Sequence, residues 1–182
     1  MDFPQGGTQS ELVLSTVSPD SLGVALLALG LSPGSSTWPE AETALFIPFR
    51  IHRATPWSYL FAVNGAVQDG NLDLGIYTVQ GRRLASTTSI SQSGSQGATI
   101  GSSFVSGTSI LLHPGRYFMG LVFDGTTAEV YGWDIDVNVV DPRALGILTM
   151  ASAFPLPATI TPAGSRGFIP YVALAASPLI FS

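Results

Sequence analysis

The sequence predicts an all-β protein built as an antiparallel β-sandwich. From residue 41 onward, short segments rich in β-branched and aromatic residues recur, and Gly, Pro, Asn and Ser separate them. No segment shows a convincing helical stripe of apolar residues. About seven to nine short strands at regular intervals favour two packed antiparallel sheets over a parallel sheet.

The length and the distribution of residues predict one sandwich domain with extended ends. The chain has 182 residues, which is typical of a single domain. We expect residues 1–40 to form an amino-terminal arm or attachment segment and residues 41–182 to form the β-sandwich domain. The end of the domain is rich in proline, so we expect it to be mostly extended, with a strand at 168–174.

The segments before residue 64 predict two strands. Residues 18–30 fit a helix that follows Ser18 or a buried strand, and both alternatives stay open. Residues 44–51 predict a strand that lies at a sheet edge or carries a bulge, because Pro48 cannot donate a hydrogen bond. Residues 57–63 predict a second strand, which the favoured turn pair Asn64-Gly65 closes.

The stretch "LDLGIYTV" alternates between apolar residues and Asp73, Gly75 and Tyr77. This period of two predicts a half-buried strand, followed by a turn at Gln80-Gly81 and a returning strand. Residues 86–109 are almost all small or polar, and predict a linker, a mobile loop or a long loop held by its neighbours.

The next segments predict two strands separated by a turn, followed by a hairpin. Residues 109–112 and 116–123 are typical of strands on either side of a turn at 113–115. Asp124-Gly125 is a hairpin signal, so residues 128–140 are expected to pair with the strand before them.

The composition favours a protein whose surface is covered by partner chains over one with a neutral Ser/Thr-rich surface. Only 10% of the residues are charged, against about 25% in ordinary soluble domains, while 46% are hydrophobic. All seven basic residues are Arg, and interfaces deplete Lys but retain Arg. The net charge of −5 argues against a nucleic-acid partner.

Candidate chemistry is sparse. The chain has no Cys, which excludes disulfides, thiolate metal sites and a thiol nucleophile, and its lack of Lys excludes a phosphate-loop or Schiff-base lysine. His52 is interpreted as a solvent-facing or interfacial strand residue, and His113 as an exposed turn residue. Asp134, Asp136 and Asn138 imitate the start of a calcium loop but lack its later ligands, which favours a solvated strand face over a metal or arginine site. We therefore expect no catalytic, cofactor or metal site, and no enzymatic activity.

The aromatic residues are the remaining candidates for a binding surface. Flat aromatic rings can bind sugars, although they more often anchor a core or an interface. The candidates for a receptor or interface surface are Trp38, Trp57, Tyr131 and Trp133, with Tyr77 as a further aromatic. The longest apolar stretch, residues 22–31, is shorter than the roughly 20 residues of a membrane span, and the first basic residue is Arg50, so we expect neither membrane insertion nor a secretory signal.

Several short motifs resemble a known family. The "IPFRI" segment, the "NG" pair, the "N-x-D-x-GIY" strand, the "G-x-RL-x-S" return and the "L-x-PG-x-Y" segment lie within residues 41–125. Together they resemble a jelly-roll-like β-sandwich of tailed-bacteriophage structural proteins. The resemblance implies a homo-oligomer, with a trimer favoured, that assembles in the host cytoplasm and resides in the virion.

Within that family the resemblance implies a tail fibre or a receptor-binding or adaptor component. Such a protein would contact itself, other virion proteins and a host surface glycan or receptor. The chain has no coiled-coil heptads and no repeats, which indicates a compact part rather than a long fibre. The alternatives are a capsid decoration or cement protein and, from another class, a glycan-binding module or depolymerase.

Overall fold

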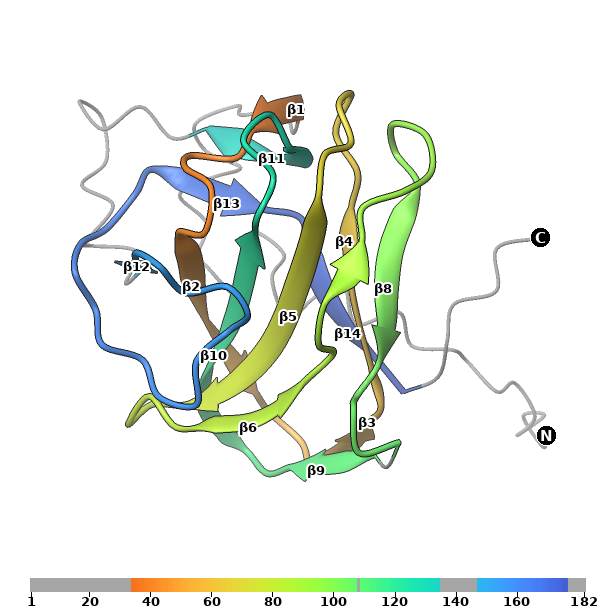
Figure 1. The fold of residues 1–182 in the computed structure, drawn as a ribbon. Coiled ribbons are helices and arrows are strands. Elements are labelled where there is room, and N and C mark those ends of the chain that lie inside the picture. The colour runs from red at the N-terminus through yellow and green to blue at the C-terminus, as the bar shows by residue number, and fades with distance from the viewer. Residues whose placement is uncertain (1–33, 108, 135–146, 177–182) are drawn as a thin grey trace, which may run out of the picture.

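A computed structural model describes residues 34–107, 109–134 and 147–176 of the chain, and these residues form β-strands without any helix (Figure 1). The all-β class predicted from the sequence is therefore confirmed. The alternatives for residues 18–30, the extended arm before them and the polar residues Asp136 and Asn138 lie outside the described residues.

One layer of the fold is a six-stranded antiparallel sheet. Its strands, in order, are β12 (Leu148–Met150), β2 (Ala44–Ile51), β10 (Gly115–Phe123), β5 (Asn71–Thr78) and β6 (Arg83–Ser86), and β7 (Ile90–Ser91) pairs with β5 beyond the end of β6. Among the described residues, the ladder between β12 and β2 ends at Phe46, and Pro48 pairs with Phe118 of β10. Pro48 therefore lies beyond the described part of the β12–β2 ladder, and its missing N–H leaves no gap there.

The second layer consists of two short sheets that Tyr171 joins. One contains β8 (Thr99–Ser103), β4 (Tyr59–Val63) and β14 (Val172–Ala175), and the other contains β1 (Gly34–Thr37), β11 (Glu129–Asp134) and β13 (Phe168–Pro170). The Tyr171 N–H donates to the Tyr131 carbonyl at 2.7 Å, and the Tyr171 carbonyl accepts from Val63 N–H at 3.2 Å. A further pair, β3 (Thr55–Trp57) with β9 (Ile110–Leu112), lies at one end of the layers (Figure 1).

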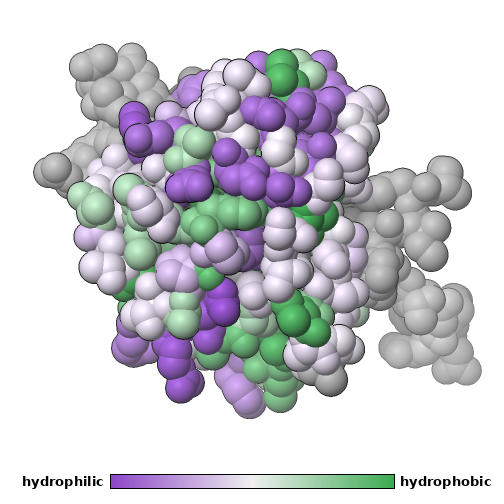
Figure 2. Space-filling view, in the orientation of Figure 1, coloured by the Kyte–Doolittle hydropathy of each residue, from purple (hydrophilic) through white to green (hydrophobic). Residues whose placement is uncertain are grey.

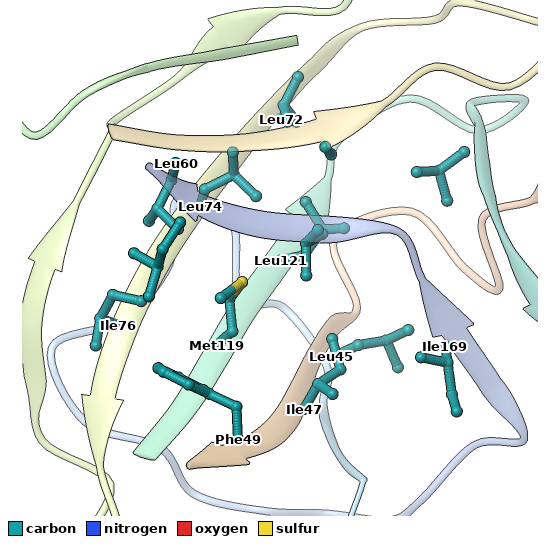
Figure 3. Packing of buried hydrophobic residues seen from close by; sticks show 14 of the residues in the cluster. Leu45, Ile47, Phe49, Leu60, Leu72, Leu74, Ile76, Met119, Leu121 and Ile169 are labelled. Carbon is teal, nitrogen blue, oxygen red and sulfur yellow. The ribbon is translucent and has the colours of Figure 1, made fainter. Parts of the chain in front are cut away.

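The main core lies between these two layers. Alternate residues of β2, β5 and β10 point inward and meet side chains such as Leu60 of β4 and Ile169 of β13 (Figure 3). Leu72, Leu74 and Ile76 all lie on this inner face and are fully buried. Burying one such aliphatic side chain contributes about 1.5–3 kcal/mol, so this interior is the dominant favourable term in folding. The described strands thus form several antiparallel sheets around a shared core.

The outer face of the six-stranded sheet is also covered, which corrects the expectation that residues 72–79 form a half-buried strand. Residues 151–163, called the strap here, run across this face between β12 and β13 (Figure 1). Leu156 and Ile160 of the strap pack with Phe46 and Tyr77 in a second buried cluster. Every residue from Leu72 to Tyr77 is consequently buried, because the strap, which lies more than seventy positions later in the sequence, covers this face.

Two expected turns do not form hairpins. Asn64 is fully buried and pairs in an isolated bridge with Val130, and β4 pairs with β8 and β14 instead of β5. The strand after Asp124-Gly125 pairs with β1 and β13 instead of β10. Both edges of β10 are already bonded to β2 and β5, so no edge is left for β11.

The low-complexity segment contributes strands to both layers. Within residues 86–109, β7 pairs with β5 and β8 pairs with β4, which corrects the expectation of a linker or mobile loop and agrees with the alternative of a segment held by neighbours. Ile100 supplies an apolar anchor, with an exposed fraction of 5%. At the end of the expected arm, β1 pairs with β11 and Trp38 is buried. Residues 57–63 are divided into β3 and β4 at Ser58.

Candidate interaction surface

The aromatic candidates lie mostly inside the domain. Trp38, Trp57 and Trp133 have exposed fractions of 3%, 3% and 7%, whereas Tyr131 is partly exposed. The Trp38 ring lies 4.9 Å from that of Phe123, and its Nε1–H donates to the Thr43 carbonyl at 2.9 Å. The three tryptophans therefore serve the core and offer no flat ring to a ligand.

The polar candidates do not converge on a centre. His52 and His113 are exposed at one end of the six-stranded sheet, as expected. Asp134 is exposed at the end of β11 and accepts a hydrogen bond from Ser36 Oγ at 2.6 Å. No group of three or more potential metal-ligating side chains occurs within the residues that the structure describes. In the same residues, no helix has the length and apolar character needed to cross a bilayer.

Three polar side chains under the strap, those of Asp73, Tyr77 and Arg83, form hydrogen bonds with the strap backbone. Asp73 Oδ2 accepts from the Leu156 N–H at 2.9 Å, and Tyr77 Oη donates to the Pro157 carbonyl at 2.7 Å. The Arg83 guanidinium donates to the Leu156 carbonyl. Burial raises the pKa of Asp73, against the opposing effects of its hydrogen bonds and of Arg83. The pKa of Tyr77 is also raised, mainly by burial. These groups fasten the strap to the sheet.

Acidic side chains gather where β2 and β5 begin and β10 ends. This end, called the acidic end, carries Glu40, Glu42, Asp69, Asp124 and Glu129. Asp69 Oδ2 accepts from both the N–H and the hydroxyl of Thr127 at 2.9 Å, which lowers the Asp69 pKa. Asp124 accepts from the side chain of Asn71 at 2.9 Å. The loops are thus held together by hydrogen bonds to these two carboxylates.

Arginines gather at the opposite end of the same strands. This end, called the arginine end, carries Arg50, Arg53, Arg82 and Arg116, which are exposed, together with the half-buried Arg83. Arg50 and Arg116 are direct partners in the ladder between β2 and β10, so their Cβ atoms lie roughly 5 Å apart on the same face. Two like charges in this position repel each other. No carboxylate of the described residues forms an ion pair with either guanidinium.

Exposed aliphatic residues accompany the arginines. Val79, Leu84, Val105 and Leu111 are 49%, 36%, 63% and 55% exposed, and all lie in strands or loops at this end. Figure 2 shows hydrophobic surface in the lower part of the view, where β6 and β9 lie in Figure 1. Leu84 and Val105 line an open hollow of about 320 Å³ between β6 and the loop after β8. Enrichment of arginine and depletion of lysine are typical of protein interfaces.

No family of known proteins matches the chain, and no curated protein aligns with it significantly. The candidate surface therefore rests on the geometry described above.

Sequence reasoning identified the lack of lysine but not the arginine end. Arg50 and Arg116 are far apart in the sequence, and only the register of β2 with β10 places them side by side. The pair Arg82-Arg83 beside a turn was the one local signal.

Proposed function

We propose that this chain is a virion structural protein of a tailed bacteriophage, with a jelly-roll-like domain that associates with copies of itself. It acts as a tail fibre, receptor-binding or adaptor component, and a homotrimer is the favoured assembly. It catalyses no reaction and works through the surfaces that it presents. The motifs between residues 41 and 125 support the virion assignment, and the lysine-free, charge-poor composition supports self-association.

The observation that carries the proposal is the surface of the arginine end. The directly opposed Arg50 and Arg116 repel each other, and the same end carries Leu111 and Val105, both more than half exposed, so this end has no evident use in a protein without a partner. A partner surface would cover the aliphatic side chains and place negative charge against the guanidinium groups. The proposal therefore assigns this end to assembly.

The use of the buried polar groups agrees with a structural role. Asp73 and Asn64 are almost fully buried, and each forms hydrogen bonds with residues distant in the sequence. Such bonds stabilise one arrangement of loops and strap, which a building block needs.

Light scattering on the purified whole chain tests self-association. At micromolar concentration we expect a mass of at least two copies of the 19.0 kDa chain. A single species at the monomer mass would contradict self-association. Immunogold labelling of virions from the organism that encodes the chain tests the location, and label on the tail supports the first assignment.

Immunogold labelling and a glycan array distinguish the two alternative functions from the first assignment. Label on the head would favour a capsid decoration protein. A glycan array combined with a reducing-sugar assay tests the glycan-binding module or depolymerase. The burial of Trp38, Trp57 and Trp133 within one chain argues against a tryptophan-lined sugar site.

A further inference from the structure

We propose that the arginine end of one copy docks on the acidic end of the next copy, so that the chain assembles head to tail. This inference rests on the proposed self-association and identifies the surfaces that carry it. It also defines a heterologous contact, in which two different patches meet.

The charge distribution along the strands is the first argument. Arg50, Arg53, Arg82 and Arg116 lie where β2 and β5 end and β10 begins, whereas Glu40, Glu42, Asp69 and Asp124 lie at the other end of these strands. The two ends therefore carry an excess of opposite charge, although the exposed Arg166 also lies near the start of β2.

The separation of the two ends is the second argument. β5 has eight residues, and eight residues at 3.3–3.4 Å each span roughly 26 Å. The Debye length at physiological ionic strength is about 8 Å, so the two ends of one molecule scarcely attract each other. Contact between copies brings the charges together and relieves the repulsion between Arg50 and Arg116.

The chemistry of the two surfaces is the third argument. Arg50 and Arg116 project from opposed positions on the same face of the sheet, and a guanidinium can bind a carboxylate through two parallel hydrogen bonds. Glu40 and Glu42 are exposed in the loop before β2 and can reach a neighbouring molecule. Val67, which is 42% exposed, gives the acidic end an aliphatic side chain to meet Leu111 or Val105.

The geometry of a head-to-tail contact has a consequence for assembly. Each copy uses both of its ends, so the contact either closes into a ring or continues as a stack. A ring of three copies would agree with the proposed homotrimer. The acidic end, rather than a nucleic acid or acidic polymer, is the favoured occupant because the chain as a whole has a net charge of −5.

Reciprocal charge reversal tests this contact. The variant R50E/R116E carries acidic residues at both ends, and the variant E40R/E42R carries basic residues at both ends. Replacing two opposed arginines with two opposed glutamates keeps a like-charge pair in the ladder, so the fold is expected to remain intact. R50K/R116K serves as the control that retains charge. Circular dichroism and thermal melting verify that every variant is folded.

Sedimentation velocity on the whole chain gives the readout. We expect the natural chain and R50K/R116K to form assemblies at 50 mM salt that dissociate as the salt concentration rises toward 0.5 M. Salt screens exposed charges from each other, and the screening length is already about 10 Å at 0.1 M. Each reversed variant alone is expected at the monomer mass of 19.0 kDa, whereas an equimolar mixture of the two variants reassembles. Reassembly of the mixture is the result that a general loss of stability would not produce.

Three results would overturn the inference. If the natural chain assembles and R50E/R116E assembles equally well, self-association stands and the head-to-tail contact is wrong. If that variant instead loses only its retention on a heparin column, the arginine end serves an anionic polymer. If the natural chain is monomeric at low salt, both this contact and the proposed self-association fail.

Discussion

The backbone N–H of Leu156 donates a hydrogen bond of 2.9 Å to Oδ2 of Asp73, across 83 positions of sequence. Asp73 Oδ1 accepts a second bond, from the Thr87 hydroxyl at 3.3 Å. Both partners come from outside β5, so one buried carboxyl group ties the strap and the segment after β6 to the centre of the sheet. The outer face of β5 is thereby closed to solvent.

Replacing Asp73 with Asn is expected to change how stability depends on pH. Burial raises the pKa of Asp73, so the folded chain binds its proton more tightly than the unfolded chain does. The free energy of unfolding of the natural chain should fall as the pH rises from the ordinary Asp range through the raised pKa. Asn keeps a side-chain oxygen for Leu156 but has no proton to lose, so urea unfolding should show the Asn variant gaining relative stability over this range. Parallel pH profiles for the two proteins would contradict the raised pKa.

Replacing Gly75 with Leu is expected to damage folding. A Cβ at this position would lie 3.1 Å from Leu156 Cδ1 and 3.2 Å from the Ala85 carbonyl oxygen, and the rest of a leucine would find no space under the strap. Overpacking of this kind costs about 1–3 kcal/mol, or more where the backbone must move. Gly34→Ala is the control, because a Cβ there meets nothing within 4 Å. A soluble Gly75→Leu protein that melts like the natural chain would refute the packing described for β5.

Replacing Tyr77 with Phe is expected to lower the free energy of unfolding by about 1 kcal/mol, a typical value for one hydrogen bond. The change removes the 2.7 Å bond from the Tyr77 hydroxyl to the Pro157 carbonyl. It retains the edge-to-face contact with Phe46, whose ring centroid lies 5.2 Å away. Tyr131→Phe, at a partly exposed position, should cost less than about 0.5 kcal/mol. Equal losses in the two variants, measured by urea unfolding, would show that the strap is not held by this hydroxyl.

Replacing Asn64 with Ala is expected to cost about 1–3 kcal/mol, because buried polar groups would lose their partners. Asn64 Nδ2 donates to the Ser93 carbonyl at 2.6 Å, and Oδ1 accepts from Gln92 Nε2 at 3.2 Å. Its backbone N–H also donates to the Ala98 carbonyl at 2.8 Å. The exposed Ser95→Ala variant in the same loop should change stability by less than about 0.5 kcal/mol. Hydrogen exchange should show faster opening of residues 92–98 in the Asn64 variant, and unchanged exchange would contradict its role in holding this loop.

The strands themselves could be predicted because their signals are local. β2 has the bounds expected for residues 44–51, and β10 agrees with the prediction for 116–123 to within one residue. β-Branched and aromatic residues at these positions fit a pleated, buried surface whatever their partners are. The turn at Gly81 also formed as expected, and its φ of 81° is one that glycine adopts without strain.

The pairing of the strands could not be predicted in the same way. Asn64-Gly65 and Asp124-Gly125 resemble hairpin turns, yet the strands that follow them pair elsewhere. The buried Asn64 side chain is used to hold the loop at Ser93, and β10 already has a partner on each edge. A turn signal reports only local backbone preference, which competing long-range pairs override.

The candidate surface, too, could be predicted only in part, because its composition can be read from the sequence but its arrangement depends on strand register. The scarcity of charge and the absence of lysine can be read directly from the residues, and the prediction of a surface covered by partners depends on them alone. The position of Arg50 opposite Arg116 comes from the register of two strands that are distant in sequence, and so does the arrangement of acids and arginines at opposite ends. The period of apolar residues and the composition can be read along the chain. Burial of both faces of β5, and the separation of acids and arginines to opposite ends, depend on contacts that form only when the chain folds.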